Sequence, residues 1–213
     1  AIAGGQPVPK IYLIEDSAPN AFATGRNPDH AIVAITRGLR DKLTRAELQA
    51  VMAHEMSHVR NYDILFAMMM AVLVGVVVLL ADYFRRSLWY GGRRSSRRSS
   101  KGGGAVIVIL IVAIVLSIIA PILAKIIELA VSRQREYLAD ASAVDLTRDP
   151  DALASALAKI SNDPEVLEAA NRATQHLYIV NPIKSFEERA SSLFSTHPPI
   201  KDRIARILSL KHA

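Results

Sequence analysis

The segment HEMSH places two histidines and a glutamate, His54, Glu55 and His58, within five residues. If the segment is helical, His54 and His58 lie one turn apart on one face, where both imidazoles can bind the same metal ion. Glu55 then projects beside the pair, where its carboxylate can take a proton from a water molecule at the metal. This H-E-x-x-H pattern predicts a catalytic zinc site with Glu55 as general base.

The helix that must carry these residues is predicted to begin after Thr44. Thr44 and Glu47 have the spacing of a capping box. The apolar residues that follow recur at helical spacing and give the helix one buried face: Leu48, Val51, Met52 and Val59. Neither Gly nor Pro lies between His58 and the apolar run that begins at Ile64. The sequence therefore predicts that this helix continues unbroken into that run.

Two long apolar runs follow along the chain. Residues 64–81 form an 18-residue run without a charge, and residues 105–124 form a 20-residue run broken only by Ser117 and Pro121. A bilayer core requires about 20 apolar helical residues. The runs therefore predict a transmembrane hairpin. The alternative is a pair of buried core helices in a soluble protein.

The loop at residues 85–104, between the two runs, is rich in Ser, Gly and Arg and holds no acidic residue. Its seven basic residues are Arg85, Arg86, Arg93, Arg94, Arg97, Arg98 and Lys101. This composition is typical of a membrane-flanking loop attracted to lipid head groups, and it favours the lipid bilayer over nucleic acid as the partner. The chain has no cysteine, so a zinc site must use histidine and carboxylate ligands.

A third zinc ligand is expected from the polar continuation of the second run, because an antiparallel hairpin brings that segment beside the histidine helix. Its acidic residues include Glu128, Glu136 and Asp140. Glu128 is too close to the bilayer, whereas Glu136 lies about 18 Å beyond the run. Asp140, one turn further, is placed to accept a hydrogen bond from a ligand imidazole. The alternative is a solvated acidic face paired with Arg133 or Arg135.

Four motifs together resemble the HtpX family of membrane zinc metalloproteases, gluzincins related to the prenyl-protein endoproteases of eukaryotes. The motifs are HEMSH before an apolar run, SRQREYLADASA, STHPPIKDRI and PNAFATGR. They occur in the family's order and cover nearly the whole chain. The resemblance implies one Zn²⁺ per chain, with Glu136 of the E-x-x-x-D motif as the third ligand beside His54 and His58, and Asp140 as the partner of a ligand.

The resemblance also implies roles for the residues around His197. His197 would help to stabilise the oxyanion, and Arg203 would support it. From the residues alone, His197 is a polar residue ahead of a helix that begins at proline, and His176 or His212 is equally plausible.

The PNAFATGR segment resembles the edge strand that pairs with a substrate backbone by strand addition. The residues implied in substrate binding are Asn20, Ala21, Phe22 and Ala23. From the residues alone, the segment is an ordinary turn followed by a strand.

The predicted fold class is α+β and mostly helical: a zincin-like metalloprotease domain with a small N-terminal β-sheet, interrupted by a transmembrane helical hairpin. Short β-rich runs predict strands within residues 10–15, 20–25 and 30–36. Further helices are predicted within 149–161, 163–177 and 200–210. The expected domain boundaries are 1–63 for the first part of the protease domain, 64–84 and 105–127 for the spans, 85–104 for the basic loop, and 128–213 for the C-terminal part.

The resemblance implies zinc-dependent cleavage of misfolded or damaged membrane proteins, at an inner membrane that the chain crosses more than once. Two alternatives are a prenyl-protein processing protease and a non-catalytic membrane scaffold that keeps the metal site. The family implies a catalytic domain facing the cytoplasm, but the basic loop would itself prefer the cytoplasm. The family has two further N-terminal spans, so the sequence is expected to be part of a longer protein. No oligomeric state is predicted.

Overall fold

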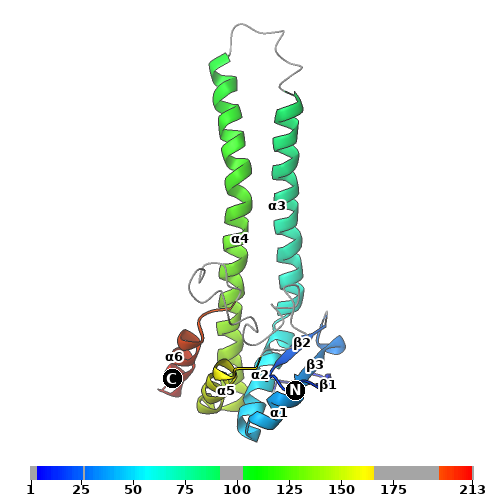
Figure 1. Cartoon of the computed structure of the whole chain (residues 1–213), viewed down its shortest axis with the longest axis vertical. Coiled ribbons are helices and arrows are strands. Elements are labelled where there is room, and N and C mark those ends of the chain that lie inside the picture. Colours follow the sequence, from blue (N-terminus) through cyan, green and yellow to red (C-terminus); the bar gives the residue numbers. More distant parts are fainter. Residues whose placement is uncertain (1–3, 26, 92–102, 166–196, 213) are drawn as a thin grey trace. The chain divides into compact units, whose positions relative to one another are not determined.

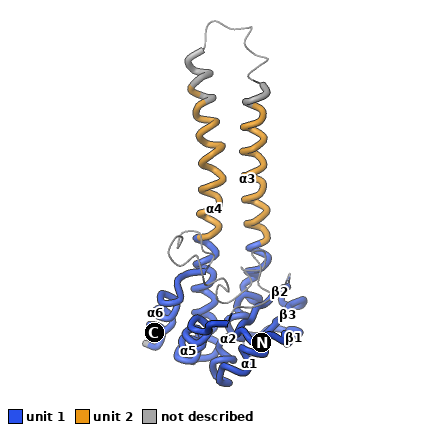
Figure 2. The backbone as a smooth tube through the Cα atoms, in the orientation of Figure 1, with its two compact units in different colours: residues 1–67, 130–213 blue, residues 68–129 orange. Residues whose placement is uncertain are grey.

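The computed structural model describes residues 4–25, 27–91, 103–165 and 197–212 of the 213-residue chain. The chain divides into two compact units (Figure 2). Unit 1 comprises Ala1–Ala67 and Ala130–Ala213, and unit 2 comprises Met68–Leu129. Most described residues are helical, and three strands form one small sheet (Figure 1). The predicted fold class, a mostly helical protein with a small N-terminal sheet, is confirmed.

The sheet has the strand order β1-β3-β2. The central strand β3 (Ile32–Thr36) pairs in parallel with β1 (Lys10–Ile14) and antiparallel with β2 (Ala21–Thr24). Each strand falls within its predicted range. Within the described residues, β2 pairs with β3 alone and is therefore an edge strand.

A short helix, α1 (Arg37–Lys42), follows β3 directly. The Thr36 side chain accepts a hydrogen bond from the backbone N–H of Leu39 at 3.1 Å, which caps the helix. The sequence analysis missed this helix, because six residues are too few to show helical periodicity.

Helix α2 (Arg45–Arg60) has the predicted capping box. The Thr44 side chain accepts from the Glu47 backbone at 3.3 Å, and the Glu47 carboxylate accepts from the Thr44 backbone at 2.8 Å. The same carboxylate accepts from Ser155 at 2.6 Å and from Lys159 at 2.8 Å. Glu47 therefore both starts α2 and joins it to α5 (Pro150–Asn162).

The prediction of an unbroken helix after His58 is wrong. Helix α2 ends at Arg60, and α3 (Asp63–Gly91) starts a new helix. Between them Tyr62 adopts the left-handed conformation with φ 55°, which costs a non-glycine residue about 1–2 kcal/mol. The Arg135 guanidinium donates a hydrogen bond to the Asn61 carbonyl at 2.7 Å and so stabilises the turn from a distant part of the chain.

Helix α4 (Gly103–Thr147) is continuous and contains Pro121. Both α3 and α4 contain stretches long and apolar enough to cross a membrane, judged by length and composition. Asp63–Ser87 contains an 18-residue window with mean hydropathy 3.0, and Ile111–Thr147 contains one with mean hydropathy 2.4. The exact limits of any spans stay a prediction.

The core of unit 1 fixes the elements that carry the site. Val51 of α2 and Leu153 and Leu157 of α5 are almost fully buried. Ile207 of α6 (Ile200–Ser209) joins the same cluster. Asp149 caps α5, and a short 3₁₀ turn, η3 (Leu210–His212), follows α6. The helices predicted within 149–161 and 200–210 are confirmed, whereas most of 163–177 lies outside the described residues.

Candidate active site

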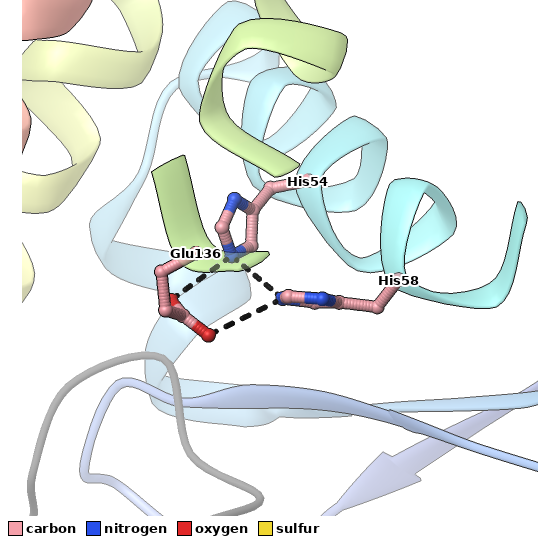
Figure 3. A group of neighbouring side chains, drawn as sticks. All are labelled: His54, His58 and Glu136. Atoms are coloured by element: carbon pink, nitrogen blue, oxygen red, sulfur yellow. Dashed lines mark hydrogen bonds and ion pairs between the residues drawn. The ribbon is translucent and has the colours of Figure 1, made fainter. Parts of the chain in front are cut away.

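Two helices bring three potential zinc ligands together (Figure 3). Helix α2 presents His54 and His58 one turn apart, with their Nε2 atoms 3.1 Å apart. Helix α4 presents Glu136, whose Oε2 lies 3.7 Å from His54 Nε2 and whose Oε1 lies 3.6 Å from His58 Nε2. Zinc ligands at 2.0–2.1 Å in a tetrahedron lie about 3.3 Å from one another. The donor types and their spacing therefore fit one zinc ion.

Asp140 fixes the orientation of the His54 ring. Its Oδ1 lies 3.0 Å from His54 Nδ1. An ionised carboxylate can only accept, so Nδ1 carries the proton and the lone pair of Nε2 faces the other ligands. This is the contact to a ligand imidazole for which the sequence favoured Asp140.

Arg203 of α6 forms ion pairs with both site carboxylates on α4, Glu136 and Asp140. It is fully buried, donates to Asp140 through Nε at 2.8 Å and Nη2 at 2.7 Å, and places Nη1 3.2 Å from Glu136 Oε2. Sequence analysis expected Arg203 to support His197. The structure pairs it with Asp140 and Glu136.

The charges around these carboxylates keep them ionised. Burial raises the pKa of Asp140, but the adjacent Arg203 outweighs it and lowers that pKa to about 2. Burial also raises the pKa of Glu136, but the neighbouring His197 and Arg203 hold that pKa well below its usual value. An ionised Glu136 is the form that binds a metal cation.

Glu55 lies in a different environment on the same helix. Its side chain is buried, and burial raises its pKa, which the neighbouring His54 and His58 only partly offset. The Glu55 carboxylate accepts a hydrogen bond from the backbone of Ala23 in β2. The predicted general base therefore touches the edge strand of the sheet.

His197 lies beside the cluster, just ahead of α6. Its Nδ1 is 3.3 Å from Glu136 Oε2, and its side chain is 12% exposed. Of the other two candidates, His212 is the last residue of η3, and His176 lies outside the described residues. Proximity to Glu136 thus favours His197 as the third histidine of the site.

The segment predicted to bind substrate forms the start of β2. The Asn20 backbone N–H donates to Thr36 Oγ1 at 2.8 Å, and the Asn20 carbonyl accepts from the Thr36 backbone at 2.9 Å. Ala21 and Ala23 are buried, and Phe22 between them is half-buried. These bonds fix where β2 begins. A substrate contact by these residues stays a prediction.

Sequence reasoning missed Asp63, and it named Arg135 only as a possible partner of a solvated acidic face. Asp63 Oδ2 lies 2.7 Å from His58 Nδ1, and Arg135 forms an ion pair with Asp63. In an unbroken helix, a residue five positions after His58 would point about 140° away from it. The only available signal was an acidic residue shortly after the metal-binding motif.

Comparison with known proteins places these features in a family. The model of peptidase family M48 matches residues 1–211. The Protease HtpX homolog of Dictyoglomus thermophilum is 49% identical over 207 residues, which cover 97% of this chain and 65% of the relative. The Protease HtpX homolog of Listeria monocytogenes (serotype 4b, strain CLIP80459) is 49% identical over 212 residues, which cover 97% of this chain and 69% of the relative. The chain thus spans about two thirds of the length of these relatives.

A solved structure shares the fold. The crystal structure of S. mikatae Ste24p matches 94% of this chain and 46% of its own chain with a TM-score of 0.58, at 20% sequence identity. At this identity the likeness concerns the fold alone. Together with the family match over residues 1–211 and the 49% identity to HtpX homologues, it confirms the resemblance found in the sequence motifs: this chain belongs to peptidase family M48.

Proposed function

We propose that this chain forms the catalytic part of a membrane-bound zinc endopeptidase. The observation that carries the proposal is the cluster of His54, His58 and Glu136 at zinc-compatible spacing, with the buried Glu55 next to it. The 49% identity to proteases named HtpX homologues supports the same function. A structural zinc site usually closes with four protein ligands and needs no adjacent base, which argues against the scaffold alternative.

The proposed chemistry assigns a task to each side chain. A zinc ion held by His54, His58 and Glu136 would polarise the peptide carbonyl and lower the pKa of a water molecule. Glu55 accepts the proton of the attacking water and passes it to the leaving amine nitrogen. Its raised pKa makes it a stronger base than an exposed glutamate. His197 donates a hydrogen bond to the oxygen that gains negative charge.

The edge strand β2 suggests how the substrate binds. An extended peptide can add to the backbone of an edge strand as a further strand. The contact between Ala23 and Glu55 means that a peptide added along β2 would pass beside the general base. Only an extended segment can add to a strand in this way. This favours misfolded or damaged proteins as substrates over folded ones.

The apolar helices favour membrane proteins as substrates. Glu136 lies on α4, the helix that also contains one of the two stretches able to cross a membrane. HtpX homologues and the two apolar helices indicate a membrane protein. We propose that α3 and α4 both cross the inner membrane and that unit 1 faces the cytoplasm, as in the family that the motifs resemble.

Labelling of single cysteines tests this orientation, because the chain has no cysteine of its own. Ala46, exposed in unit 1, and Ser99 in the basic loop are each replaced by cysteine in intact cells. A membrane-impermeant maleimide applied from outside should label Ser99→Cys and spare Ala46→Cys. The reverse pattern would mean that the seven basic residues between the two apolar runs determine the topology.

Glu55→Gln tests the proposed activity. Cleavage of an unfolded model protein by detergent-solubilised, zinc-loaded protein should fall by about 10²–10⁴-fold, because the amide cannot accept the proton. Glu15→Gln, an exposed glutamate in unit 1, is the matched control and should cleave like the wild type. Cleavage that survives in Glu55→Gln would refute Glu55 as the base. Preference for a prenylated peptide would instead support the prenyl-protein alternative.

A further inference from the structure

A partly buried ion pair lies on the far side of His58 from the ligand cluster. His58 Nδ1 is 2.7 Å from Asp63 Oδ2, and Asp63 Oδ1 forms an ion pair with Arg135. Asp63 is only 7% exposed. Because its carboxylate can only accept, Nδ1 of His58 carries the proton and the lone pair of Nε2 faces Glu136. Asp63 thereby selects the tautomer of His58 that a metal requires.

The two histidines are held in the same way by different parts of unit 1. His54 Nδ1 contacts the Asp140 carboxylate, which also accepts hydrogen bonds from Arg203. His58 Nδ1 is hydrogen-bonded to the Asp63 carboxylate, which forms an ion pair with Arg135. Each ligand imidazole thus has a carboxylate at Nδ1, and each carboxylate has an arginine.

The chain takes up a costly backbone conformation where this contact forms. Asp63 can reach back to His58 because Tyr62 turns the chain in the left-handed conformation. Arg135 stabilises that turn twice: it donates to the Asn61 carbonyl at 2.7 Å, and its guanidinium lies 4.6 Å from the centre of the Phe66 ring. Arg135 therefore stabilises both the turn and the Asp63 carboxylate that follows it.

We propose that Asp63 is a positioning residue that orients His58 for zinc, and that Arg135 holds Asp63 in place. The inference rests on the proposed zinc site and extends it. The competing role for Asp63 is purely local: an acidic residue in the first turn of α3 interacts favourably with the helix dipole. That role would affect the stability of α3 but would leave the metal affinity of the folded protein unchanged.

Zinc affinity, measured by competition with a chelator, separates the two roles. In the full chain in detergent, Asp63→Ala should weaken zinc binding by about 10–100-fold, as removal of a hydrogen-bond partner of a ligand typically does. Asp63→Asn should lose less zinc affinity, because the asparagine amide oxygen can still accept a hydrogen bond from the Nδ1–H of His58. Asp145→Asn, an exposed aspartate on α4 paired with Arg148, is the control and should bind zinc like the wild type.

Cobalt substitution gives a second readout that does not depend on activity. The visible absorption bands of bound Co²⁺ should change in Asp63→Ala and stay unchanged in Asp145→Asn, since they report the geometry around the metal. Circular dichroism of the zinc-free variants shows whether each one folds. If Asp63→Ala does not fold, the zinc affinity and Co²⁺ spectrum of Asp63→Asn decide between the two roles of Asp63.

The outcomes distinguish the inference from the proposal on which it rests. Wild-type protein that binds no zinc would overturn both. Wild-type protein that binds zinc, with folded Asp63 variants that match its zinc affinity within threefold and its Co²⁺ spectrum, would overturn the positioning role alone. A graded loss of affinity, larger for alanine than for asparagine, supports it.

Discussion

Unit 1 and unit 2 differ in the kind of side chain that each buries and exposes. Unit 1 buries the ionisable side chains of His54, Glu55, Glu136, Asp140 and Arg203, none more than 7% exposed. Unit 2 exposes large apolar side chains: Val72 is 65% exposed and Leu79 is 70% exposed. Among the described residues of unit 2, those that are buried are few, and they include the small Ala81 and Ser117.

The difference shows that burial has a different physical meaning in each unit. In unit 1, removing a charge from water is costly, and partners must compensate for it. In unit 2, exposed apolar area on this scale would be unfavourable in water but not in lipid. The two units are therefore built for different solvents, and substitutions should affect them in opposite ways.

The largest effect is expected from Arg203→Met in unit 1. The methionine leaves Glu136 and Asp140 buried without their shared cation, which should destabilise the zinc-free protein by about 3–5 kcal/mol. Urea unfolding in detergent measures the change. Arg206→Met on the same helix is the control: Arg206 is exposed and lies over the Tyr137 ring, a contact that contributes about 0.5–1 kcal/mol. Equal stability of the two variants would contradict the assigned role of Arg203.

An intermediate effect is expected when a charge is placed on the exposed surface of unit 2. Leu73, 57% exposed on α3, lies near the middle of the predicted span, and Leu73→Lys should disfavour membrane insertion by about 2.5–3.5 kcal/mol. Alkaline extraction of membranes should release more of this variant. Val8→Lys makes a similar change at a 73% exposed position of unit 1 and should have little effect. If the two behaved alike, the surface of unit 2 would not face lipid.

The smallest effect is expected at Glu47, and it should depend on pH. Burial raises the pKa of Glu47, but Lys159, Ser155 and Thr44 outweigh it and lower the pKa from 4.5 to about 2. The ionised form thus stabilises the fold above about pH 4.5, and this contribution is lost as the pH falls towards 2. Glu47→Gln should cost about 2 kcal/mol at pH 7 and almost nothing near pH 2.

Thermal unfolding of zinc-free wild type and variant across this pH range isolates the contribution of Glu47, because the other titrating groups are common to both proteins. Asp145→Asn removes an exposed ion pair and should change stability by less than about 0.5 kcal/mol at any pH. A Glu47→Gln penalty that stays constant down to pH 2 would contradict a lowered pKa.

The sequence determined the features that depend on neighbouring residues. The spacing of Thr44 and Glu47 predicted the capping box, and short β-rich runs predicted the three strands. The H-E-x-x-H spacing put His54 and His58 on one face of the helix. Each of these depends on backbone periodicity and short-range hydrogen bonds, which a short stretch of sequence specifies. The four motifs together predicted the family.

Only the tertiary structure decided where α2 ends and what holds the ligands. No glycine or proline marks the break at Tyr62. The turn is stabilised by Arg135, 74 positions away from Asn61 in the chain. That turn brings Asp63 to His58, just as the packing of α6 brings Arg203 to Asp140. Interactions between such distant residues form only when the helices pack, so local sequence patterns could not reveal them.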